Sequence, residues 1–229
     1  MWHRAWIETR WKVVLMLLVN GLIGALLIDD PASGAVWRQR FGTVLPMIFC
    51  VNGIVLAGSG VASQVSQKPG QTVHTSMLFL LSLPITRRRL VLVRQATGAL
   101  AAMGVVLTTL IGYAVAAPEL RAVVSPGIAL AYVASVLPVV LVAYAVSALL
   151  ATVLDQLWQT YAAMAVVGSV LGGVPPSRLW RVVVEAVSPL TSRQLTDIWT
   201  TIGVAGLVCI LFSAMLSFTA VGVVQRKQF

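Results

Sequence analysis

Six apolar stretches follow one another along the chain, separated by short polar or turn-rich segments. A helix needs about 20 mostly apolar residues to cross the hydrocarbon core of a bilayer. The strict alternation of apolar and polar residues that marks a half-buried strand is missing from these stretches. The pattern therefore predicts an all-α integral membrane protein with six spans, near residues 13–28, 41–63, 90–117, 127–153, 157–174 and 199–224.

The twelve residues before the first apolar stretch form an amphipathic, tryptophan-rich segment. Trp2 and Trp6 are one helical turn apart and share a face, with Trp11 following among basic residues. Tryptophan favours the headgroup region of a membrane, and arginine and lysine can extend toward it. We expect an interfacial helix over residues 1–12 that turns into the first span. The alternative is a plain basic flank.

A short apolar segment separates the second and third spans. It is too short to cross a bilayer and too apolar for an ordinary loop, and Pro84 would end it. Its apolar residues follow helical spacing over one face, formed by Val73, Met77, Leu80 and Leu81. An amphipathic helix on the cytoplasmic face, placed to contact another protein, accounts for both properties.

Prolines and small residues punctuate the predicted spans. Pro46 and Pro138 each remove one helical hydrogen bond, so each is a possible hinge or a static kink. Small residues recur four apart, which allows close helix approach and predicts packing seams. These positions are Gly53 and Ala57, Gly98 and Ala102, Ala143, Ser147 and Ala151, and Gly168 and Gly172.

Composition supports the membrane assignment and a single domain. Hydrophobic residues make up 59% of the 229-residue chain and charged residues only 10%, whereas soluble domains hold about 25% charged residues. No linker or fixed-period repeat divides the chain, so we treat residues 1–229 as one transmembrane domain.

The distribution of charge predicts the orientation. With six spans and a cytoplasmic N-terminus, ten of the sixteen lysines and arginines lie inside and six outside. Two of the seven acidic residues lie inside and five outside, so the net charge is +8 inside (ten minus two) and +1 outside (six minus five). The excess of basic residues places both termini in the cytoplasm. Because these residues cluster where spans end, the overall +9 indicates topology rather than nucleic-acid binding.

The sequence lacks the constellations that enzymes require. His3 and His74 are far apart, no metal-ligand spacing is present, and neither a phosphate-binding loop nor a nucleophile elbow occurs. We therefore expect no catalytic residue, metal or cofactor in this chain. Cys50 and Cys209 are interpreted as packing residues, with a disulfide between them as the alternative.

Polar residues inside the spans are neutral, and we expect them to form hydrogen bonds between or within helices rather than to bind a ligand. Ion-coupled transporters usually keep ionisable groups at membrane depth. Any transport by this chain would therefore draw energy from elsewhere. The polar residues are Asn20, Asn52, Ser59, Thr108, Thr109, Ser135, Ser147 and Ser169.

One stretch of the chain resembles a known family. Residues 81–90, Leu-Ser-Leu-Pro-Ile-Thr-Arg-Arg-Arg-Leu, followed by Arg94, are similar to the SLP-[VI]-[ST]-R signature of type-2 ABC export permeases. The position between spans two and three, the N-terminal segment and the basic C-terminus also resemble that family. Arg87, Arg88, Arg89 and Arg94 would lie at the inner headgroups and anchor the third span.

The resemblance implies a division of labour between subunits. In this family the segment before the proline is a coupling helix that binds in a cleft of a separate ATPase subunit, which holds ATP and Mg. Carried over, the coupling segment is 71–83, and its ATPase contacts are Gln71, Val73, His74, Met77, Leu78, Leu80, Leu81 and Leu83.

The expected function is that of the permease subunit of an ATP-driven exporter in a bacterial inner membrane. It would form the substrate pathway with a second permease chain, identical or a sibling. The alternative is a non-transporting membrane scaffold or assembly factor. A membrane enzyme is disfavoured, because no ionisable residues converge.

Overall fold

The computed structural model describes residues 2–28, 44–58, 87–116, 126–154, 165 and 192–226. This part of the chain holds five helices and no strand. The helices are α1 (Trp2–Ile28), α3 (Leu45–Gly58), α5 (Arg87–Ala116), α7 (Pro126–Val153) and α10 (Ser192–Arg226).

Four of these helices are long and apolar enough to cross a membrane, and they correspond to the first, third, fourth and sixth predicted spans. Their apolar parts are Thr9–Leu26, Val91–Ala116, Ala129–Val153 and Ile202–Val223. Helix α3 falls within the second predicted span but is shorter, with an apolar part from Leu45 to Ala57. The fifth predicted span, 157–174, lies outside the described residues except for Ala165.

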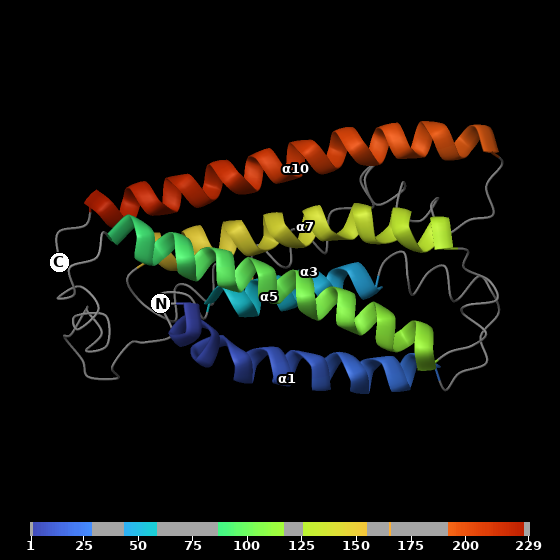
Figure 1. Ribbon diagram of the computed structural model, residues 1–229, viewed down its shortest axis with the longest axis horizontal. Coiled ribbons are helices and arrows are strands. Elements are labelled where there is room, and N and C mark those ends of the chain that lie inside the picture. The colour runs from blue at the N-terminus through green and yellow to red at the C-terminus, as the bar shows by residue number, and fades with distance from the viewer. Residues whose placement is uncertain are drawn as a thin grey trace.

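The helices lie roughly lengthwise in one bundle, with α1 and α10 at opposite edges and α3, α5 and α7 between them (Figure 1). Helix α7 packs against both α10 and α3, whereas α1 packs chiefly on α5. Helices α1 and α5 run in the same direction, and α3, α7 and α10 run in the opposite one (Figure 1). The start of α1 and the end of α10 therefore lie at the same end of the bundle.

Helix α1 continues without interruption through residue 12, where the sequence predicted a boundary between an interfacial helix and the first span. No glycine or proline occurs before Gly21, so nothing in this segment breaks the helical backbone. The first turns are inclined to the rest of the helix (Figure 1). Trp11 is exposed, and the Arg10 guanidinium lies 5.7 Å from the centre of its ring.

The bundle buries a compact core while its outer helices expose apolar side chains. The core is formed by large residues of all the inner helices, including Leu45, Phe49, Val105, Val136 and Val140. Helices α1 and α10 carry leucine, valine and phenylalanine on their exposed faces. An apolar exterior of this kind suits lipid, because a spanning helix satisfies its backbone internally and needs no polar coat.

Two of the predicted packing seams are confirmed. A Cβ atom added at Gly53 would lie 3.0 Å from the backbone oxygen of Val140, so α3 and α7 approach closely there. At Gly98, an added Cβ would overlap the hydroxyl of Tyr144, which brings α5 against α7. Gly168 and Gly172 lie outside the described residues.

Candidate functional site

A chain of buried polar side chains joins three helices in the middle of the bundle. The Asn52 amide on α3 donates to Oδ1 of Asn20 on α1 at 3.1 Å. The Asn20 amide in turn donates to Oγ1 of Thr109 on α5 at 3.0 Å. Asn20 is fully buried and the other two nearly so. We call Asn20, Asn52 and Thr109 the polar node.

Tyr113 strengthens the attachment of α1 to α5 beside the polar node. Its hydroxyl donates to the backbone oxygen of Asn20 at 2.6 Å. Gly24, one turn after Asn20, makes room for the ring, because a Cβ at this position would overlap Tyr113. The glycine thus lets a long aromatic side chain reach the backbone of the neighbouring helix.

The hydrogen bonds of the polar node give it a structural role, because they join α1, α3 and α5. A buried amide without partners carries a free-energy cost in an apolar environment, and the node gives the Asn20 amide a donor and an acceptor. Hydrogen bonds between membrane helices contribute about 0.6 kcal/mol on average and up to ~1.7. The expectation that Asn20, Asn52 and Thr109 form hydrogen bonds within the bundle is confirmed.

The other neutral polar residues behave differently. Ser135 donates to the carbonyl of Tyr132 in its own helix at 2.8 Å, and Thr108 is exposed. The Ser147 hydroxyl is buried and has no hydrogen-bond partner in the part of the chain that the structure describes. Ser59 and Ser169 lie outside the described residues.

A second hydrogen bond from a tyrosine hydroxyl to a backbone oxygen joins α7 to α5. The Tyr144 hydroxyl donates to the backbone oxygen of Gln95 at 3.1 Å, directly over Gly98. The side-chain amide of Gln95 is buried, and neither its nitrogen nor its oxygen has a hydrogen-bond partner among the described residues. Sequence reasoning singled out Gly98 but missed Tyr113 and Tyr144, because the pairing of a tyrosine with a distant glycine depends on helix register.

The four predicted anchor arginines lie at the start of α5. Arg87, Arg88 and Arg89 are its first residues, with Arg88 and Arg89 exposed. Arg94 is buried nearly two turns further in and makes an interaction there. The start of α5 lies at the same end of the bundle as the start of α1 and the end of α10 (Figure 1). We call this end the basic end.

The charges of the described helices divide unequally between the two ends. Eight basic residues and one acidic residue lie in the halves nearest the basic end, a net of +7 (eight minus one). The other halves hold one of each, a net of zero (one minus one). The basic-end residues are Arg4, Glu8, Arg10, Lys12, Arg87, Arg88, Arg89, Arg94 and Arg226, and Arg193 and Asp197 lie toward the other end.

The two prolines occupy different positions in their helices. Pro138 lies inside α7, buried, where a Cβ on Gly206 of α10 would be 3.5 Å from its ring. Pro46 is the second residue of α3. Residues 29–43, which precede this helix, lie outside the described residues, so a hinge at Pro46 stays a prediction. A hinge at Pro138 stays a prediction.

The predicted ATPase contacts, Gln71 to Leu83, fall outside the described residues, as does His74 among them. Among the residues that the structure places, no group of three metal-ligating side chains is found. Cys50 and Cys209 are both free, so the interpretation as packing residues is confirmed for buried Cys50, and the disulfide is absent.

In comparisons with known proteins, the chain matches no protein-family model and no curated protein sequence. Its function is therefore inferred from its own residues and their arrangement.

Proposed function

We propose that this chain is the permease subunit of an ATP-driven exporter, coupled to separate ATPase subunits that hold ATP and Mg. The observation that carries the proposal is the position of Arg87–Arg89. These residues complete the motif at 81–90 and also begin α5 at the basic end of the bundle. The proposed coupling segment directly precedes them in the chain.

The unequal distribution of charge supports an orientation with the basic end in the cytoplasm. Segments rich in lysine and arginine remain in the cytoplasm when membrane helices insert. A net of +7 against zero supports a cytoplasmic basic end, with both termini there. The segment before Arg87 would then face the compartment that supplies ATP.

The direction of the helices supports six spans. Helix α7 ends at the basic end, and α10 begins at the opposite end (Figure 1). If both helices cross the bilayer, the chain must cross once more between them, and 157–174 is the apolar stretch available. Together with α3 extended over 41–63, this crossing would complete the proposed topology.

The filled interior of the bundle favours a pathway shared by two permease chains. The polar node and the large residues around it occupy the space between α1, α3 and α5. A substrate path between two copies, or between this chain and a sibling, would leave that core intact. ATP binding and hydrolysis on the partner subunits would then move the two permease bundles relative to each other, and the core of each bundle would stay packed.

A membrane scaffold or assembly factor is the second candidate, and the same filled interior favours it, because a scaffold needs no pathway. The two functions differ in their partners. Only the permease requires an ATPase subunit bound to the cytoplasmic side.

Purification from native membranes tests the proposal. The tagged full-length chain, extracted in mild detergent, should carry two permease chains and two ATPase chains by mass measurement, and the complex should hydrolyse Mg-ATP. A complex without any ATPase subunit, isolated under conditions that keep the bundle folded, would contradict the permease and favour the scaffold.

A further inference from the structure

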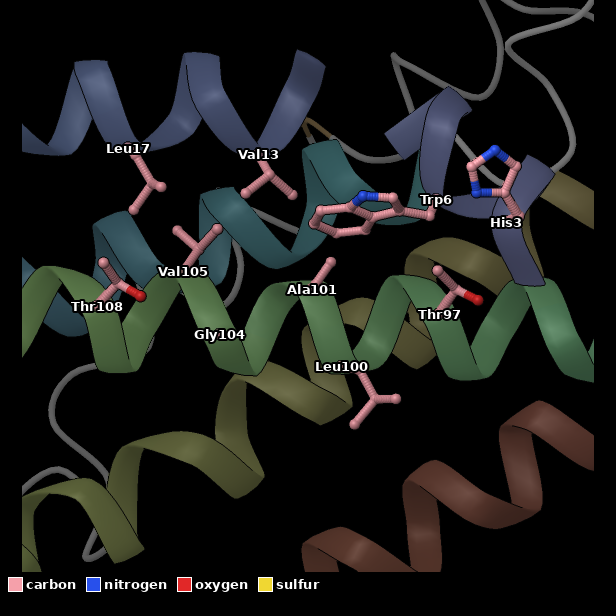
Figure 2. A pocket seen from close by; sticks show the side chains of 10 residues that line it. All are labelled: His3, Trp6, Val13, Leu17, Thr97, Leu100, Ala101, Gly104, Val105 and Thr108. Carbon is pink, nitrogen blue, oxygen red and sulfur yellow. The ribbon is translucent and has the colours of Figure 1, made fainter. Parts of the chain in front are cut away.

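We draw no further inference here: the strongest candidate, the apolar slot between α1 and α5 that is lined by Val13, Ala101 and Val105 (Figure 2), carries none, because nothing in the described part of the structure shows what covers it.

Discussion

At the scale of single residues, neutral side chains of asparagine, threonine and tyrosine form hydrogen bonds between the described helices. Between membrane helices there is no water to exclude, so packing and hydrogen bonds determine which faces meet. The polar node joins three helices through two bonds, and Tyr113 adds a third to the backbone of α1. The sequence predicts that such residues bond within the bundle, because they are neutral and lie in apolar stretches. It does not predict the partners, which depend on how three separate helices align.

Removing one member of the polar node should weaken the bundle. Thr109→Val keeps the shape of the side chain but removes the acceptor for the Asn20 amide. We expect the free energy of unfolding in detergent micelles to fall by about 0.6–1.7 kcal/mol. Thr219→Val is the control, because its hydroxyl bonds only to Met215 in its own helix and is exposed. Equal losses for the two variants would show that the node contributes no specific stability.

At the scale of helices, hydropathy predicts the middle of a span better than its flanks. Helices α5 and α7 begin and end within three residues of the spans predicted at 90–117 and 127–153, because their apolar windows end in charges or turn residues. Helix α1 joins the segment predicted as an interfacial helix to the first predicted span in one continuous helix, and the interfacial position of its first turns stays a prediction. Its first turns are polar and contain tryptophan and arginine, which suit an interfacial helix, but nothing there breaks the backbone, and the helix continues.

The close approach of α5 and α7 gives a prediction at this scale. Gly98→Ala places a Cβ against the Tyr144 hydroxyl, and overpacking of this kind costs about 1–3 kcal/mol. We expect a corresponding loss in the free energy of unfolding, partly restored by adding Tyr144→Phe, which removes the hydroxyl. Gly112→Ala, where a Cβ meets nothing within 4 Å, should be neutral or slightly stabilising. If Gly98→Ala is as harmless as Gly112→Ala, the two helices are not in register as described.

At the scale of the whole molecule, the basic end combines the features on which the proposed function depends. The start of α1, the start of α5 and the end of α10 meet there (Figure 1), and eight of the nine basic residues of the described helices lie in the halves nearest to it. Charge counting along the sequence anticipates this asymmetry, because basic residues cluster where apolar stretches end. The contact of residues 71–83 with an ATPase subunit remains a prediction. It rests on the sequence motif, because these residues lie outside the described part of the chain.

We propose that residues 71–83 couple the membrane bundle to an ATPase, and retention of that subunit by a charge variant tests this coupling. Met77→Asp with Leu80→Asp puts carboxylates on the predicted apolar face, where burial in a partner's groove would be strongly unfavourable. Thr75→Asp places one on the opposite face as the control. The purified double variant should insert normally and lose the ATPase subunit, whereas Thr75→Asp should retain it. Full retention of the ATPase subunit and of transport by the double variant would show that residues 71–83 are a membrane anchor and would contradict the account.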